Sequence, residues 1–281
     1  MRVLVFGPTG MLGHEMVKVS RGKGFEVTTS GRSDSDFFFE VGVSDFSELR
    51  LQGFDYIVNC IGLITHNIDE SDPQSVVSAT LLNAEFPRRL ADFAEENGSR
   101  LIQIATDCVF SGSKGGYVET DTHNATDVYG MTKSAGEIES PNSMHIRASI
   151  VGRERSGRKS LLEWVIGQPK NAKAPGFTDR LWNGVTTTAF AKVVAGVISG
   201  DAFSSGVSHL VPKDRVSKFE LVSMIASALG RSDLEITPSE SGLAKDLTLA
   251  TDHPEVNLGL WQAAGYRELP TIKELIAEIA S

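Results

Sequence analysis

Two side chains four residues apart, Tyr129 and Lys133, have the types and spacing that proton-transfer chemistry uses. On a helix, residues at this spacing project from the same face, so the ammonium would lie near the phenol. A nearby cation favours the ionised phenol and moves its pKa from about 10 toward the neutral range. The pair therefore predicts a group that exchanges a proton, whereas an exposed tyrosine stacked on a lysine stem is the simpler interpretation of an isolated match.

Three glycines spaced three residues apart, Gly7, Gly10 and Gly13, follow the apolar run Val3 to Phe6. A strand that ends in such a loop and continues into a helix presents N–H groups and the positive end of the helix dipole to an anion. The spacing differs from the Gly-x-Gly-x-x-Gly fingerprint of classical dehydrogenases, and a merely structural turn is the alternative. We predict a pyrophosphate site formed by Gly7, Thr9, Gly10, Met11, Leu12 and Gly13.

A third candidate, Thr106, follows the apolar segment 101–105, which is predicted to be a strand. Doubly wound sheets bind their ligands at the carboxyl ends of the strands. The Thr106 hydroxyl could therefore reach the same oxygen that Tyr129 protonates. The alternative is a threonine that only ends a strand.

The elements that must position these residues alternate between strand-like and helix-like segments, which predicts an α/β fold with a Rossmann-like, doubly wound parallel sheet. Helical composition spans 127–139, the segment that carries Tyr129 and Lys133. Further strands are predicted at 25–29, 56–61, 101–105 and 144–149.

Helix starts are indicated by Asp72-Pro73 and by two capping-box pairs, Ser217 with Glu220 and Thr271 with Glu274. After residue 152 the pattern is less regular, because Gly, Pro and basic residues crowd 152–184. We predict a Rossmann domain over 1–152 plus about 185–204, and a smaller C-terminal substrate-binding lobe over about 153–184 and 205–281.

Composition excludes several classes of protein. The 281-residue chain has a net charge of −9, which argues against nucleic acid or an anionic membrane as a general partner. Its two cysteines are too few for a disulfide framework. The four-residue apolar run after Arg2 is too short for a signal peptide or a membrane span. We expect a soluble cytoplasmic protein with no nucleic-acid partner, no membrane partner and no metal site.

Taken together, the motifs resemble those of an extended short-chain dehydrogenase/reductase, and within that superfamily the dTDP-4-dehydrorhamnose reductase group. The likeness is close from residue 1 to about 150 and looser beyond. The motifs that carry it are the glycine loop, Asn59-Cys-Ile-Gly62, Asn83-Ala-Glu-Phe-Pro, Ala105-Thr-Asp-Cys-Val-Phe-Ser-Gly112, Tyr117-x-Glu119-x-Asp121 and Tyr129-Gly-x-x-Lys133-x-x-x-Glu137.

The resemblance implies a catalytic triad of Thr106, Tyr129 and Lys133. Tyr129 would give a proton to a sugar ketone, Thr106 would hydrogen-bond the same oxygen, and Lys133 would hold the nicotinamide ribose and depress the pKa of Tyr129. It also implies that Cys60, Ile61 and Gly62 line the cofactor and that Asn83 fixes that wall. Related 4,6-dehydratases have a glutamate where this chain has Cys108, so the resemblance disfavours dehydration.

Cofactor choice depends on the end of the second predicted strand. An acidic residue there would bind the ribose 2′-hydroxyl, but this chain reads Thr29-Ser30-Gly31-Arg32-Ser33. Arg32 with the Ser30 and Ser33 hydroxyls suits a 2′-phosphate, which favours NADP(H), whereas a solvated loop residue is the simpler interpretation of Arg32. Asp34 and Asp36 nearby leave NAD(H) open.

Basic residues gather in 153–180, either as a solvated face or as contacts for the diphosphate of a sugar nucleotide. In the second interpretation Arg180, Trp182 and Asn183 form a substrate pocket wall, together with Cys108 and Thr106 on the sheet side.

The sequence therefore predicts an NADPH-dependent reductase of a 4-keto-6-deoxy sugar nucleotide, acting on a C=O group. Two alternatives stay open, a sugar-nucleotide epimerase and a non-catalytic NADP-binding regulatory subunit. The resemblance is also compatible with a homodimer.

Overall fold

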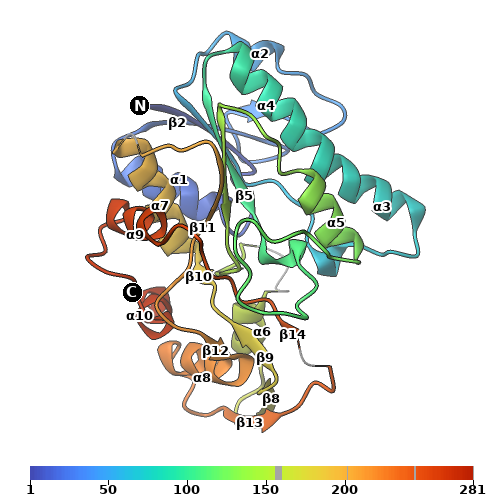
Figure 1. Cartoon of the computed structure of the whole chain (residues 1–281), viewed down its shortest axis with the longest axis vertical. Helices are drawn as coiled ribbons and strands as arrows, with labels where there is room; N and C mark the ends of the chain where they lie inside the picture. The colour runs from blue at the N-terminus through green and yellow to red at the C-terminus, as the bar shows by residue number, and fades with distance from the viewer. Residues whose placement is uncertain (156–159, 201, 244, 281) are drawn as a thin grey trace.

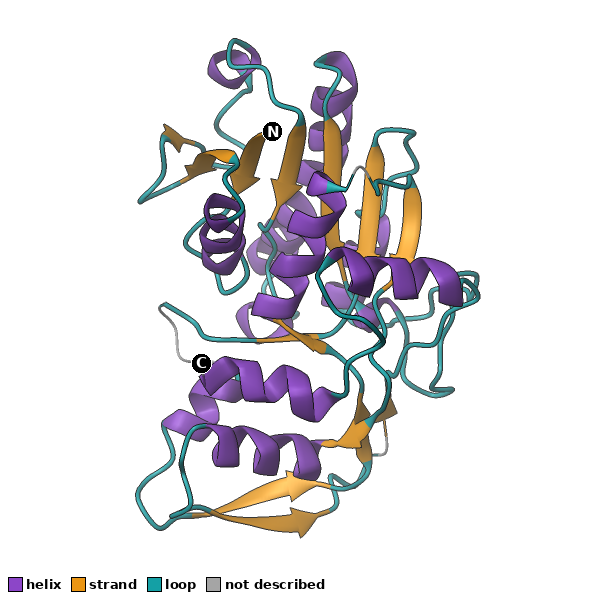
Figure 2. Ribbon diagram, turned by 90° about the vertical axis from the view of Figure 1, so that its left-hand side faces the viewer, coloured by secondary structure: helices purple, strands orange, loops and turns teal. Residues whose placement is uncertain are grey.

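A computed structural model describes residues 1–155, 160–200, 202–243 and 245–280. Residues 156–159 of the predicted second lobe lie outside the described residues. In the described chain, a parallel sheet has the strand order β3-β2-β1-β4-β5-β6-β11 (Figures 1 and 2). Its strands are β1 (Arg2–Phe6), β2 (Glu26–Gly31), β3 (Phe37–Phe38), β4 (Tyr56–Asn59), β5 (Arg100–Ala105), β6 (Ser143–Arg147) and β11 (Gly206–His209).

The strand order reverses between β1 and β4, and this switch point is where doubly wound sheets bind ligands. Alternate residues of β1 face opposite sides of the sheet. Val3 and Val5 pack under α1 (Gly13–Gly22), α7 (Thr187–Ser199) and α9 (Pro254–Ala263). Leu4 and Phe6 pack under α2 (Ser47–Arg50) and α4 (Phe86–Glu96). The predicted Rossmann-like, doubly wound parallel sheet is confirmed.

A continuous helical segment beside the sheet consists of α3 (Pro73–Thr80), the π turn η2 (Leu81–Glu85) and α4. Pro87 has no N–H to donate to the carbonyl of Asn83, so the regular ladder cannot continue through this turn. The turn packs against α5 (Val128–Ala135), the helix that carries Tyr129 and Lys133. The turn thereby places Asn83 next to the helix that carries the two predicted catalytic residues.

A second lobe, at the bottom of Figure 1, has its own apolar core built largely on α6, α8 and α10. Val222 and Ile225 pack there with Val165 and Ile276. Its elements are α6 (Leu161–Ile166), β8 (Lys173–Phe177), β9 (Arg180–Trp182), β12 (Val216–Ser217), α8 (Lys218–Ala228), β13 (Glu235–Ser239), β14 (Lys245–Asp246) and α10 (Ile272–Ala277). The bridge between the lobes is the strand pair β7 (Ile150–Val151) and β10 (Val185–Thr186).

The predicted helix starts are confirmed. The Asp72 carboxylate accepts from the N–H of Gln74, and both capping boxes form, at Ser217 with Glu220 and at Thr271 with Glu274. One predicted boundary differs. The sequence predicts residues 206–209 in the second lobe, but β11 pairs with β6 in the main sheet, and Leu210 directly after it is buried in the core under α7.

In the described part of the chain, none of the helices is both long and apolar enough to cross a bilayer.

The predicted helix 127–139 is shorter in the structure, since α5 ends at Ala135.

The glycine loop is packed more closely than any side chain would allow. Gly7 has a φ of +74° and donates its N–H to the carbonyl of Ser30 at 2.9 Å. A Cβ at Gly13 would lie 1.9 Å from the carbonyl oxygen of Gly7. These glycines let α1 begin directly over the end of β1, as the spacing predicted.

We expect Gly13→Ala to destabilise the fold, because the added methyl group must push the start of α1 away from the loop. Overpacking of this kind typically costs about 1–3 kcal/mol. Gly22→Ala is the matched control, since a Cβ there has nothing within 4 Å and the change at a compatible site stabilises by ~0.4–1 kcal/mol. Urea unfolding of both variants measures the difference, and equal midpoints would contradict this account of the loop.

Candidate active site

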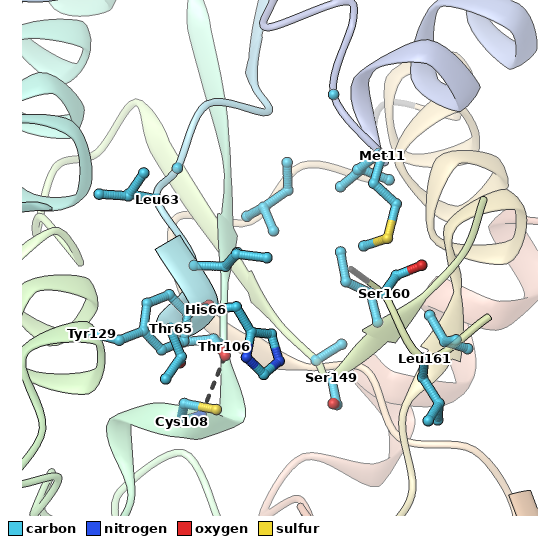
Figure 3. A pocket seen from close by; sticks show the side chains of 18 of the residues that line it. Met11, Leu63, Thr65, His66, Thr106, Cys108, Tyr129, Ser149, Ser160 and Leu161 are labelled. Atoms are coloured by element: carbon cyan, nitrogen blue, oxygen red, sulfur yellow. Dashed lines mark hydrogen bonds between the residues drawn. The ribbon is translucent and has the colours of Figure 1, made fainter. Parts of the chain in front are cut away.

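A cavity of about 610 Å³ opens at the carboxyl ends of β1, β4 and β5 and extends to the second lobe. Figure 3 shows Tyr129, Thr106 and Cys108 on one side of it and Met11, Ser160 and Leu161 on the other. The cavity thus contains surfaces from both lobes.

The three predicted catalytic residues line this one cavity. Thr106 directly follows β5, and its hydroxyl accepts from the N–H of Cys108 at 3.2 Å. Tyr129 and Lys133 lie one turn apart on α5, whose start is capped by the Asp127 carboxylate accepting from the Gly130 N–H at 2.8 Å. Separate elements therefore bring a phenol, a hydroxyl and an ammonium to the same space.

The electrostatics of this trio differ from one expectation. Lys133 was predicted to lower the pKa of Tyr129, but burial raises the pKa of that phenol, and a hydrogen bond with Thr106 only partly opposes the effect. The Lys133 ammonium donates instead to the carbonyl of Ile104 at 2.8 Å. Burial also lowers the pKa of Lys133 itself to about 8. Tyr129 is consequently a protonated phenol at neutral pH, the form that can donate.

The nucleotide end of the cavity contains most of the predicted cofactor residues. Thr9, Gly10, Met11 and Leu12 line it with Cys60, Ile61 and Gly62, while Gly7 and Gly13 lie beneath the loop as packing positions. This concave backbone at the start of α1 fits a dinucleotide pyrophosphate. Burial raises the pKa of Cys60 to about 12, so it remains a thiol.

Asn83 lies behind the part of the cavity lining that follows β4. Its side-chain carbonyl accepts from the Leu63 N–H at 2.8 Å, and its amide donates to the Leu63 carbonyl at 2.9 Å. The two bonds fix the segment after β4, which is the supporting position that the family resemblance implied.

The end of β2 lies outside the main cavity. Ser30 is fully buried, and its hydroxyl has no hydrogen-bond partner among the residues that the structure describes. Arg32 is exposed one residue beyond β2. Asp36 is engaged by the N–H and hydroxyl of Thr29, both at 2.8 Å, which holds its pKa low.

At the substrate end the structure brings in Trp182 and Cys108 but not Arg180 or Asn183. Arg180 donates to the hydroxyl of Ser241 at 2.8 Å. Asn183 exchanges two hydrogen bonds with the backbone of Leu249, which makes it a brace between segments. Burial raises the pKa of Cys108, so this residue presents a neutral thiol to the cavity.

Sequence reasoning missed several polar residues of the cavity, among them Asp107, Ser149 and Lys218. Asp107 accepts from the hydroxyl of Thr106 at 3.2 Å, and Ser149 accepts from the indole N–H of Trp182 at 2.9 Å. The capping box at Ser217 could have located Lys218 on the first turn of α8 but not its direction, which tertiary packing sets.

Another missed feature is a buried guanidinium, Arg147 at the end of β6, that holds α5 against the sheet. It is 1% exposed and donates to both oxygens of Glu137, which follows α5. It also donates to His209 at 2.6 Å and to His123 at 2.9 Å. Burial lowers the pKa of both imidazoles, which therefore accept as neutral rings.

The fold and this site define an oxidoreductase of the extended short-chain dehydrogenase/reductase class. The model of the family described as RmlD substrate binding domain matches residues 1–279, and the chain belongs to this family.

Three relatives illustrate the range of similarity. A dTDP-4-dehydrorhamnose reductase of Streptomyces griseus is 36% identical over 294 residues, covering 95% of this chain and 89% of that protein. A protein of Danio rerio named methionine adenosyltransferase 2 subunit beta is 26% identical, covering 84% of this chain and 76% of its own. The crystal structure of dTDP-4-dehydrorhamnose reductase from Bacillus anthracis in complex with NADP has a TM-score of 0.77, covers 99% of this chain and 98% of its own, and shares the fold at 18% identity.

Lys133→Met should stabilise the free protein at pH 7. Below pH 8 the lysine is charged both folded and unfolded, so the folded state bears the whole cost of burying it. The variant loses the hydrogen bond to Ile104. Allowing for that loss, we expect its free energy of unfolding to rise by ~2 kcal/mol, and this gain to shrink between about pH 8 and 10.5.

Urea unfolding at pH 7 and pH 10 measures this gain as the difference between variant and wild type. Lys18→Met, at a side chain that is 74% exposed, is the control and should shift little at either pH. A destabilised Lys133→Met protein, or a gain that does not change with pH, would contradict the conclusion that burial lowers the pKa of Lys133.

Proposed function

We propose that the protein is an NADPH-dependent reductase of a 4-keto-6-deoxy sugar nucleotide of the dTDP-4-dehydrorhamnose type. The observation that carries the proposal is the convergence of Thr106, Tyr129 and Lys133 on one cavity that also contains the glycine loop. Membership in the RmlD family, and a 36% identical relative with the reductase name, support the same substrate class.

NADP(H) is the proposed cofactor because the described residues suit it at two places. The glycine loop and the start of α1 offer backbone N–H groups to the pyrophosphate. Beyond β2 the exposed cation Arg32, rather than an acidic residue, is available to a 2′-phosphate. When bound, the nicotinamide supplies the hydride.

The residues of the chain supply the remaining parts of the reaction. Tyr129, kept protonated by its burial, donates its phenolic proton to the substrate oxygen as negative charge develops there. Thr106 lines the same cavity, where its hydroxyl can orient the phenol and the substrate oxygen. Lys133, with a pKa near 8, lies one turn from Tyr129, where it can restore the proton and hold a ribose hydroxyl.

The shape of the substrate end suits a deoxysugar. Ile150, Leu161, Trp182 and Leu221 give this end of the cavity an apolar surface. A 6-deoxy sugar carries a methyl group and one apolar ring face, both of which pack well on indole and aliphatic side chains.

A second candidate, a non-catalytic NADP-binding subunit, is favoured by the likeness to methionine adenosyltransferase 2 subunit beta of Danio rerio. The complete set of Thr106, Tyr129 and Lys133 in the cavity favours catalysis. Turnover of NADPH with a substrate distinguishes the reductase from the non-catalytic subunit.

Consumption of NADPH against a panel of 4-keto-6-deoxy nucleotide sugars tests the proposal. We expect turnover with at least one member of the panel and its loss, by at least about 10³-fold, in Tyr129→Phe, because removing the proton donor removes general-acid catalysis. Binding of NADPH by that variant, measured by fluorescence titration, should stay within about twofold. NADPH binding without turnover on the whole panel would indicate the regulatory subunit, and sugar interconversion without net NADPH consumption an epimerase.

Arg32→Ala should weaken NADPH binding by roughly 10- to 100-fold and NADH binding by less than about twofold, because a charge-assisted bond to a phosphate contributes about 1.5–3 kcal/mol. Titration of both cofactors measures this selectivity. Arg21→Ala is the matched variant, since Arg21 lines a separate hollow with Asp36 that does not include Arg32. Selectivity lost in Arg21→Ala but kept in Arg32→Ala would place the phosphate in that hollow.

A further inference from the structure

A cation that the mechanism above does not use, Lys218, lies in the wall of the cavity. It is the first residue of α8, directly after the Ser217 cap. The antiparallel pairing of β12 with β9 places Val216 opposite Trp182. The Lys218 ammonium consequently lies 5.4 Å from the centre of the Trp182 indole ring. Two elements of the second lobe therefore hold a cation and an aromatic face together.

This ammonium is partly buried without forming an ion pair among the described residues. Taking a charge out of water without a direct partner is unfavourable, so such a group is retained where it serves a ligand. Burial is the main effect on the pKa of Lys218 and lowers it, while Asp107 and Cys108 across the cavity oppose the shift. Lys218 lines the same cavity as these two residues, which follow Thr106.

Asp107 is the matching group on the sheet side. It is 5% exposed and lines the same cavity. Its carboxylate takes hydrogen bonds from Thr106 at 3.2 Å and from the Cys108 thiol at 3.5 Å, with Ser149 as a further donor. Ser149 also accepts from the Trp182 indole, so a chain of hydrogen bonds connects the carboxylate to the aromatic face.

An ammonium, a carboxylate and an indole around one space match the chemistry of a pyranose ring. Each sugar hydroxyl both donates and accepts, so the hydroxyls of one ring can donate to Asp107 and accept from Lys218. The apolar face of the ring can stack on the indole. A diphosphate fits this place less well, because the Asp107 carboxyl offers it no positive charge and repels it when ionised.

We propose that Lys218 and Asp107, with Trp182, form the subsite that recognises the hydroxyl-bearing edge of the substrate sugar, and that Lys218 is a specificity-determining residue. The inference rests on the proposed function and deepens it. Asp107 immediately follows Thr106 in the chain, so the edge recognised here lies next to the reacting carbon.

The test compares two probes, dTDP-L-rhamnose and dTDP, the second of which lacks the sugar and ends in a free phosphate. Isothermal titration of the NADP-loaded protein gives the affinity for each. We expect Lys218→Met to weaken dTDP-L-rhamnose by at least about tenfold and to leave dTDP within about twofold. Lys218→Arg keeps the cation and should retain more of the affinity for the sugar probe than Lys218→Met does.

The matched control is Lys213→Met on the same lobe, at a side chain that is 56% exposed and outside the cavity lining. It should leave both affinities unchanged. Circular dichroism and thermal melting confirm that each variant is folded, and the methionine chain occupies a similar volume to lysine without the charge.

Three outcomes would overturn the inference. Equal weakening of both probes in Lys218→Met would place the ammonium on the nucleotide. Unchanged binding of the sugar probe would remove Lys218 from the subsite, and wild-type protein that binds dTDP-L-rhamnose no more tightly than dTDP would have no sugar subsite. Failure of the proposed function gives a different result, absence of NADPH turnover by wild-type protein, and leaves the ratio of the two affinities measurable.

Discussion

The position of the candidate active site depends on one buried cation, Arg147, at the end of β6. Its guanidinium is neutralised by Glu137 and shared with two neutral imidazoles, His123 and His209. A second hydrogen bond fixes each ring, from His123 to the hydroxyl of Ser134 and from His209 to the carbonyl of Ala250. Since an arginine can only donate, each ring must accept through Nε2 and carry its proton on Nδ1. The helix with the phenol and the ammonium is thereby tied to the sheet and to the chain that returns from the second lobe.

Around this anchor the protein keeps ionisable groups in places that disfavour their charged forms. Burial opposes ionisation of Tyr129, Lys133, Asp107 and Lys218 alike. Structures of this kind give up some stability so that charge can be stabilised on a ligand. The arrangement also has a spatial order, since the proton-transfer groups come from the Rossmann sheet and its helices, while the additional cation and the indole come from the second lobe. A ligand that spans the cavity would contact both sets of groups at once.

The sequence alone predicted those elements whose formation depends on neighbouring residues in the chain. The apolar run Val3 to Phe6 predicted β1, and mainly apolar segments with one or more polar residues predicted β4, β5 and β6. Capping chemistry located the starts of α3, α8 and α10. These signals lie within a few residues of one another. The strand β11 was missed because its four residues are short and of mixed polarity, and only their pairing with β6 identifies them. Asn183 and Arg180 were assigned to the substrate wall, yet their partners are Leu249 and Ser241, more than sixty residues away. The π turn at Asn83, the Arg147 cluster and the direction of Lys218 depend in the same way on tertiary contacts.

The return of the chain to the sheet has a consequence for engineering the specificity of this protein. In chain order, α6, β8 and β9 belong to the second lobe, α7 and β11 to the Rossmann domain, and β12 and α8 again to the second lobe. Then α9 packs back on α7 before α10 joins the lobe once more. A chimera that exchanges everything after one crossover point would therefore replace the edge strand of its own sheet. Grafting the lobe of a relative requires separate exchanges at the lobe segments, with β11 and α9 kept from the recipient.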